Sequence, residues 1–497
     1  MADTVTQQTF LKHPRSFFIG GKWVEPATSR TFDVYDSVSE EVFLTVSEGL
    51  QPDMERAVAA ARQAFDTGPW PRMSPQERAS YLVKIAEGWE QRADTLADSW
   101  TMEAGVVRTI ASSASMAVAG AFRQYASFAN SFGWEDPRTG MMGNPALLVY
   151  EPVGVVVAII PWNASSTLLT YKVAPALLAG CPVILKASPE APIAPYLLAE
   201  IAEEVGLPPG VLNVVTADRE ASELLVRDPR VDKVSFTGST AAGQLIGSIC
   251  GSRVARCTLE LGGKSPAVVL SDYDVGLVAK VLGRCAPIMT GQVCASLTRV
   301  IIDRARHDDM VEALAAEFKA IKIGNPFDPE VQMGPLAMKR QLERVSHYID
   351  VGQREGAKLA AGGARPAHLP KGYFIEPTLF GQVDNRSTIA QEEIFGPVLC
   401  VIPADNDDHA VELANDTVYG LNASVFTNDV DRAYTVGRRI RAGTVGHNAF
   451  RTDFTIAFGG FKQSGIGREG GVNGLLPYLE SKTMVFDGAP PSGASKS

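Results

Sequence analysis

The chain has 497 residues, and its 46 Lys and Arg against 56 Asp and Glu give a formal net charge of −10. A chain of this length can bury enough apolar surface to fold without disulfides, so we expect about two to four domains. The acidic balance, without blocks of Lys or Arg, excludes nucleic acid and anionic membranes as expected partners and favours small molecules.

The sequence predicts neither a secretion signal at its start nor a membrane helix in its interior. Met1 to Arg15 is polar and lacks the charged-then-apolar layout of a secretion signal. The most apolar run, residues 153–160, ends at Pro161, whereas a membrane helix needs ~20 apolar residues. We therefore expect a cytoplasmic protein.

Residues 55–132 are expected to form helices, because their apolar residues recur three and four positions apart. Ser74 and Glu77 have the spacing of a capping box at a helix start. After Pro152, short runs rich in Val and Ile alternate with helical runs, and the same texture fills residues 265–443. This alternation indicates an α/β fold with two doubly wound parallel-sheet domains, whose ligands bind at the carboxyl ends of strands.

Two further segments are predicted to be extended strands outside these domains. They are the stretch around Pro145 and residues 479–487. Because an unpaired edge strand tends to find a partner, we expect a small oligomerisation β-ribbon that pairs with another subunit.

The six cysteines contain no C-x-x-C pair and no zinc-type spacing, so neither a metal site nor a redox motif is expected. In a reducing compartment most cysteines are small buried apolar side chains. We expect this role for Cys285 and for the others, with Cys294 as the exception.

Six motifs occur in a fixed order along the chain. They are IIPWN ending at Asn163, KVSFTGST ending at Thr240, LELGGKSP ending at Pro266, GQVCASLTR ending at Arg299, EEIFGPV at 392–398 and FGGFKQSGIGRE at 458–469. Together they resemble the NAD(P)-dependent aldehyde dehydrogenase superfamily over residues 18–483.

The resemblance implies an aldehyde dehydrogenase-like fold and assigns its parts. Residues 1–132 and 153–262 would form the dinucleotide-binding domain, residues 263–465 the catalytic domain, and residues 133–152 and 470–490 the oligomerisation ribbon. It also implies a homodimer or homotetramer that oxidises a small-molecule aldehyde to the carboxylic acid with NAD.

The catalytic roles follow from the same resemblance. Cys294 would attack the aldehyde carbonyl to give a thiohemiacetal and then a thioester, since a thiolate is both a strong nucleophile and a good leaving group. Glu260 would activate the water that hydrolyses the thioester, and its presence favours hydrolysis over transfer to coenzyme A. Asn163 and the backbone N–H of Cys294 would hold the oxyanion. Lys172 and Glu469 match positions that relay a proton away from the base.

The cofactor residues are also inferred from matching motif positions. Ser239 and backbone N–H groups at a helix start would meet the pyrophosphate, Trp162 would donate nearby, Lys186 would contact the adenine-side ribose, and Glu393 would accept from the nicotinamide ribose. The full expected set is Ile159, Pro161, Trp162, Lys186, Ser188, Pro189, Glu190, Gly238, Ser239, Gly243, Leu261, Glu393 and Phe395.

Two departures from the superfamily's pattern carry hypotheses. Pro189 replaces a Glu that many NAD-preferring members use on the ribose, so we expect NADP to be accepted beside a favoured NAD, with Glu190 as a compensating residue. Ala164-Ser165 replaces an aromatic-proline pair, which predicts a wider tunnel for bulky or aromatic aldehydes. The expected substrate pocket comprises Ala164, Leu169, Val293, Ala295, Phe450, Phe454 and Phe458.

Two other functions remain open from the sequence. The chain would be a non-catalytic binding or structural protein if it kept the fold and had lost the aldehyde-oxidising activity. The presence of Cys294, Glu260 and Asn163 argues against this alternative. Alternatively, Cys294 would hydrolyse esters without cofactor as a side activity.

Overall fold

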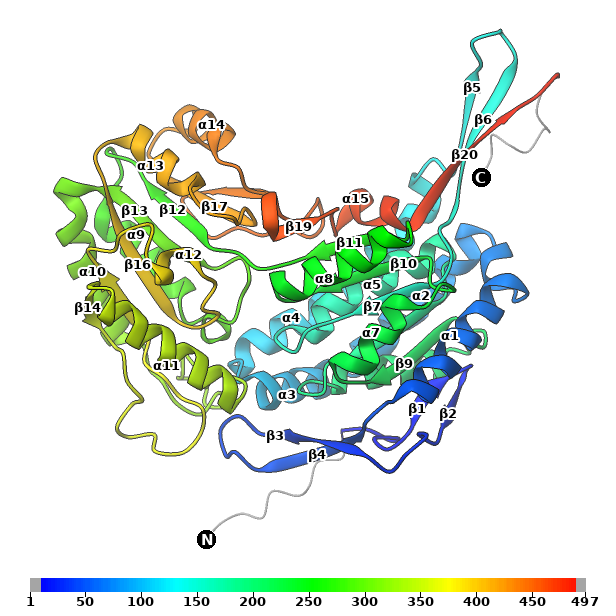
Figure 1. The fold of residues 1–497 in the computed structure, drawn as a ribbon, viewed down its shortest axis with the longest axis horizontal. Coiled ribbons are helices and arrows are strands. Elements are labelled where there is room, and N and C mark those ends of the chain that lie inside the picture. The colour runs from blue at the N-terminus through cyan, green and yellow to red at the C-terminus, as the bar shows by residue number, and fades with distance from the viewer. Residues whose placement is uncertain (1–9, 489–497) are drawn as a thin grey trace.

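The structure is a computed structural model that describes residues 10–488. The expectation of a missing secretion signal therefore falls partly outside the described residues, since Met1–Thr9 are not among them. Two lobes, each built around its own β-sheet, lie side by side, and a thin ribbon projects from one of them (Figure 1). The α/β class and the two parallel sheets predicted from the sequence are confirmed.

The first lobe holds an eight-stranded sheet in the order β19-β11-β10-β7-β8-β9-β1-β2. The strands from β11 to β9 pair in parallel, and β1, β2 and β19 pair antiparallel at the edges. The central strands are nearly all buried, as expected when helices cover both sheet faces. The strands are β1 (Phe17–Ile19), β2 (Lys22–Val24), β7 (Val156–Ile159), β8 (Val183–Ala187), β9 (Leu212–Thr216), β10 (Lys233–Thr237), β11 (Arg256–Glu260) and β19 (Gly465–Ile466).

Helices cover this sheet on both faces. Helices α2, α4, α5 and α6 form one core with it, and α1, α7 and α8 form the other. The helices predicted before residue 132 and the Ser74–Glu77 capping box are confirmed. The helices are α1 (Gln51–Asp66), α2 (Pro75–Glu90), α3 (Ala93–Ala104), α4 (Arg108–Ser131), α5 (Ser165–Ala179), α6 (Ile193–Glu204), α7 (Arg219–Arg227) and α8 (Thr240–Ser252), with the short η1 (Trp70–Arg72) between α1 and α2.

The second lobe holds a seven-stranded sheet in the order β14-β15-β16-β13-β12-β17-β18, parallel except at β14. Its strands are β12 (Ser265–Val269), β13 (Leu297–Asp303), β14 (Lys358–Ala361), β15 (Thr378–Gly381), β16 (Val398–Ala404), β17 (Asn422–Phe426) and β18 (Thr444–His447). Its helices are α9 (Val275–Cys285), α10 (His307–Ala320), α11 (Lys339–Arg354), α12 (Thr388–Gln391), α13 (Asp407–Asn415) and α14 (Val430–Arg439), with η2 (Ile288–Gly291), η3 (Arg304–Arg306) and η4 (Lys462–Ser464).

The two segments predicted as extended strands pair with each other. Strands β5 (Glu135–Thr139), β6 (Pro145–Pro152) and β20 (Leu479–Val485) form an antiparallel ribbon that projects from the first lobe (Figure 1). Within 470–490, however, residues before 479 form α15 (Gly471–Leu475) and η5 (Leu476–Tyr478), which pack on α5. A separate hairpin of β3 (Thr31–Tyr35) and β4 (Val42–Ser47) lies near the N-terminus. The domain boundaries stay a prediction.

Candidate active site

Cys294 lies in a tight loop between η2 and β13 of the second lobe. Left-handed backbone precedes the loop inside η2, with φ of 49° at Met289 and 54° at Thr290, a conformation that costs free energy for non-glycine residues. The buried Gln292 side chain holds the loop in place, because its Nε2 donates to Ala104 O at 3.2 Å and its Oε1 accepts from Ala337 N at 3.0 Å. Gln292 is a positioning residue that our site prediction left out.

The Cys294 side chain is half-buried in an apolar cluster. Burial raises the pKa of its thiol, and the negative charges of Glu393 and Glu260 raise it further, while the backbone N–H groups of Cys294 and Ala295 oppose them. The resting nucleophile is therefore the neutral thiol, and it needs a base.

Glu260 ends β11 in the first lobe and lies near enough to the Cys294 thiol of the second lobe for its charge to act on that thiol. Neither carboxylate oxygen has a hydrogen-bond partner among residues 10–488, and the side chain is buried. Burial raises the pKa of Glu260 well above its usual value; the charge of Glu469 raises it further, and Lys172 and Arg468 lower it. A carboxylate in this state is suited to accept a proton near neutral pH.

Lys172 and Glu469 form an ion pair that is buried on both sides. Lys172 comes from α5, and Glu469 is held by its backbone, which exchanges hydrogen bonds of 2.6 and 2.7 Å with Phe458. Ser235 of β10 lies 3.4 Å from Lys172 Nζ and 3.5 Å from Glu469 Oε1. The structure thus brings both predicted relay residues together beside Glu260.

Asn163 follows β7 and reaches the same loop. Its Nδ2 donates to Gln292 O at 2.9 Å, and its own carbonyl accepts from Trp100 Nε1 at 2.7 Å. An amide nitrogen carries two N–H donors, so one bond fixes the side chain and the other donor is available to an oxygen beside Cys294.

The start of α8 has the features of an anion-binding helix end. Ser239 is the N-cap, and its hydroxyl accepts from Ala242 N at 3.3 Å. Gly238 N donates to Glu260 O at 3.0 Å, which ties this turn to β11. A side chain at Gly243 would clash with Leu261, so glycine lets the helix lie directly on the strand. The free N–H groups of this first turn fit a pyrophosphate.

Trp162 and Phe395 meet edge to face, with ring centroids 5.5 Å apart, across the two lobes. Glu393 Oε1 accepts from Gly263 N at 3.1 Å, and a side chain at Gly262 would clash with the same carboxylate. Burial raises the pKa of Glu393 to about 7. The expected nicotinamide-side residues therefore converge beside the Cys294 loop.

The adenine-side residues lie at the end of β8. Burial lowers the pKa of the Lys186 amine to about 8, while the charges of Glu190 and Asp218 raise it. Glu190 accepts from Ser188 and forms an ion pair of 2.5 Å with Arg340 of the second lobe. Ile159 is a buried core residue of β7, and Pro161, two residues later, is half-buried. Pro189 is also half-buried and follows Ser188.

Most of the predicted substrate residues gather around Cys294. The cluster comprises Val293, Ala295, Phe450, Phe454 and Phe458, with Leu421. Ala164 is half-buried in the core around α3, whereas Leu169 is fully buried in the core of the first lobe and does not join the cluster. Tyr171, absent from the prediction, stacks on Phe454 with centroids 4.5 Å apart, and Phe454 stacks on Phe458 at 4.2 Å. The sequence signal that could have identified Tyr171 is its position one residue before the predicted relay residue Lys172.

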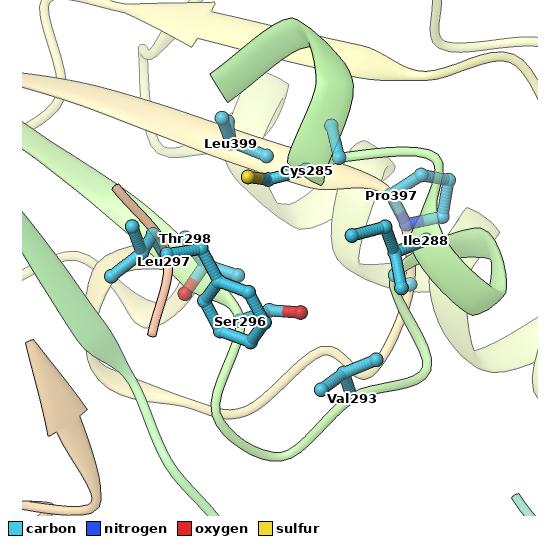
Figure 2. A pocket seen from close by; sticks show the side chains of 12 residues that line it. Cys285, Ile288, Val293, Ser296, Leu297, Thr298, Pro397 and Leu399 are labelled. Atoms are coloured by element: carbon cyan, nitrogen blue, oxygen red, sulfur yellow. The ribbon is translucent and has the colours of Figure 1, made fainter. Parts of the chain in front are cut away.

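A small cavity lies behind the Cys294 loop (Figure 2). Cys285, Ile288, Pro397 and Leu399 line it, and it shares Val293 with the apolar cluster at Cys294. Cys285 is therefore a half-buried wall residue of this cavity.

Two properties of the described chain bear on other classes of site. Among residues 10–488, no group of three or more His, Cys, Asp or Glu side chains is arranged to hold a metal ion. None of the helices in that range is both long and apolar enough to cross a membrane.

Known proteins are similar to this chain over nearly its whole length. Residues 23–484 match the aldehyde dehydrogenase family. Geranial dehydrogenase of Castellaniella defragrans is 41% identical over 95% of this chain and 98% of its own, and 3-succinoylsemialdehyde-pyridine dehydrogenase of a Pseudomonas species is 40% identical over the same shares. The crystal structure of a Mycobacterium tuberculosis aldehyde dehydrogenase with NAD+ superposes with a TM-score of 0.93 at 42% identity, covering 95% of this chain and 98% of that one.

A half-buried cysteine thiol, a buried carboxylate without a hydrogen-bond partner in residues 10–488 and a helix start with free N–H groups are the kinds of group that a nucleotide-dependent oxidoreductase with a thiol nucleophile needs. The chain belongs to the aldehyde dehydrogenase family and oxidises aldehydes with NAD.

Proposed function

We propose that Cys294, Glu260 and Asn163 carry out this oxidation in the roles expected from the sequence. The observation that supports this most is that Glu260 and Cys294 come from different lobes and lie near enough for the charge of Glu260 to act on the thiol, each with a raised pKa. Glu260 first takes the thiol proton, because the resting thiol is neutral. The thiolate then adds to the carbonyl carbon, and Asn163 Nδ2 with Cys294 N–H donates to the oxygen.

When bound, NAD would be held by Trp162, Ser239 and Glu393, and it would supply the acceptor for the hydride that leaves the thiohemiacetal carbon. The product is a thioester on Cys294. Glu260 then removes a proton from the attacking water, and the acid leaves as the thiolate is released. Lys172 and Glu469 pass the proton of Glu260 onward through the buried pair.

Cys294→Ser and Glu260→Gln test these roles separately. Cys294→Ser is expected to abolish both aldehyde oxidation and any cofactor-independent esterase activity. Glu260→Gln is expected to slow both the acylation of Cys294 and the hydrolysis of the thioester, because the same carboxylate is the base in both steps. Aldehyde-dependent NADH formation that survives Cys294→Ser would refute the assignment.

We further propose that NADP is accepted, with NAD favoured. Glu190 does not replace the missing ribose carboxylate, because its own carboxylate is occupied by Arg340 and Ser188. Lys186 is then the cation available to a 2′-phosphate. Comparing kcat/KM for the two cofactors tests this: a preference for NAD beyond about a thousandfold refutes it, and Pro189→Glu is expected to lower kcat/KM with NADP only.

The aromatic row Tyr171–Phe454–Phe458 supports a proposal for the substrate class. Stacked rings beside the nucleophile favour a flat or unsaturated apolar aldehyde, and the two relatives named above act, by their names, on geranial and on a pyridine derivative. Phe454→Ala is expected to lower kcat/KM for citral or benzaldehyde ~10-fold or more relative to acetaldehyde. Phe327→Ala, at an exposed ring, is the matched control. An unchanged ratio in Phe454→Ala contradicts the proposal.

We also propose that the ribbon assembles a homodimer or homotetramer in the cytoplasm. Its tip carries the fully exposed Met141 and Met142, and the β20 edge exposes Met484 and Val485. Apolar groups on a projecting edge favour burial against a partner. The double variant Met484→Glu/Val485→Glu is expected to lower the molar mass measured by light scattering, and an unchanged mass would refute the assignment.

A further inference from the structure

Helix α8 lies antiparallel on strand β11, and contacts along the pair define its register. A side chain at Gly243 would clash with Leu261, and one at Gly247 would lie 3.4 Å from Leu259 Cδ1. Each turn of helix therefore advances the contact by two residues along the strand, as the helix and strand periodicities require. One more turn brings Cys250 opposite Cys257.

Other contacts agree with that register. Cys250 is fully buried and Cys257 half-buried in the same core cluster. The chain returns from helix to strand in a tight turn, with Ala255 N donating to Cys250 O at 2.9 Å. Cys257 faces this core because its register partner Val234 and its strand neighbour Leu259 also do. The two thiols therefore share one face of this core and are near enough for each to shift the pKa of the other.

We propose that Cys250 and Cys257 are a redox-modification site that closes to an intrachain disulfide when hydrogen peroxide reaches the protein. The Cys257 sulfur attacks one peroxide oxygen, giving a sulfenic acid and hydroxide. The Cys250 sulfur then attacks the Cys257 sulfur, so that an S–S bond forms and the oxygen leaves as water. Overall, two thiols are oxidised by two electrons and one peroxide is reduced to two waters.

In this sequence of steps Cys257 reacts with peroxide first, and its thiol is the more acidic of the two. A hydrogen bond from Cys250 lowers the pKa of Cys257, and the nearby Lys233 charge lowers it further, whereas the pKa of Cys250 is raised. The catalytic Cys294 has a raised pKa. Because the thiolate is the form that attacks peroxide, Cys257 is expected to react before Cys294.

Trypsin separates the two cysteines, since Arg253 and Arg256 lie between them. The native full-length enzyme is treated with peroxide, its free thiols are blocked with N-ethylmaleimide, and it is then digested with trypsin. In the mass spectrum we expect peptide 234–253 joined to peptide 257–264 by a disulfide. Dithiothreitol should release the two peptides. The joined peptides should appear at lower peroxide doses than oxidation of Cys294 in peptide 285–299.

Variants distinguish a specific pair from general thiol oxidation. In Cys250→Ser the Cys257 sulfenic acid should persist and be trapped by dimedone, and in Cys257→Ser neither product should form. Cys400→Ser, at a buried cysteine elsewhere, is the control and should still give the joined peptides. Oxidation of Cys294 before any joined peptide appears, or no dimedone adduct at Cys257 in Cys250→Ser, would overturn the proposal.

Discussion

Removing the charge of Lys172 is expected to destabilise the protein much more than removing a lysine charge at the surface. The side chains of Lys172 and Glu469 are 0% and 2% exposed, so solvent does not screen the pair. Taking away one partner of a buried pair typically costs 3–5 kcal/mol, roughly, because the other charge stays buried and unpaired. Lys172→Met should therefore lower the free energy of unfolding by about that amount.

A matched surface pair gives the comparison. Lys482 and Glu151 pair on the ribbon with exposures of 55% and 49%, so Lys482→Met should cost under about 1 kcal/mol. In Lys172→Met/Glu469→Gln no unpaired charge remains at the pair, and most of the loss should be recovered. Urea unfolding at fixed protein concentration measures all of these variants. A cost below about 1 kcal/mol for Lys172→Met would refute the reasoning.

The same variant makes a second, independent prediction for pH dependence. Lys172 lowers the pKa of Glu260 and Glu469 raises it. Lys172→Met should thus raise the pKa of Glu260 further. When the pH is lowered, the base is then protonated sooner, so the acid-side fall of kcat/KM should begin at a higher pH. The double variant should move the acid limb back, because the opposing charge of Glu469 is also gone. A shift of the limb to lower pH in Lys172→Met would contradict the assigned electrostatics.

Three further predictions follow from the site. Glu260→Gln should lower steady-state kcat by about 10²–10⁴-fold and remove the stopped-flow burst of NADH, because the Cys294 thiol then lacks its base; a full burst would restrict Glu260 to the hydrolysis step. Asn163→Ala should lower kcat/KM by about 10²–10³-fold, and a tenfold smaller effect would exclude an oxyanion donor. Gly243→Ala should clash with Leu261, costing ~1–3 kcal/mol and weakening NAD binding in titrations, whereas Gly247→Ala, with ordinary contact distance, should do neither.

The sequence predicted the elements whose signals are local. The alternation of Val-rich runs and helical runs after Pro152 is a period that each segment carries by itself, and the Ser74–Glu77 box depends on four neighbouring residues. The motif order likewise identified residues that the fold then brings together from distant segments, such as Lys172 and Glu469.

What the sequence missed depends on contacts between segments. Tyr171 joins the aromatic row only because α5 lies against the loop that carries Phe454. Gln292 holds the Cys294 loop through carbonyl and amide groups of residues far away in the chain. The carboxylate of Glu190 is taken by Arg340, which no local pattern indicates. Leu169 has the right helical phase for a pocket, yet the first lobe buries it completely.

The chain passes between the two sheets at two places, between β11 and β12 and again between β18 and β19. The first connection begins at Glu260 and continues through Gly262 and Gly263, and the second carries Phe454 and Phe458. The segments that join the lobes therefore also carry Glu260 and two of the stacked rings near Cys294. A substitution that shifts either connection is expected to displace the base or the aromatic row relative to Cys294, even where it contacts neither of them.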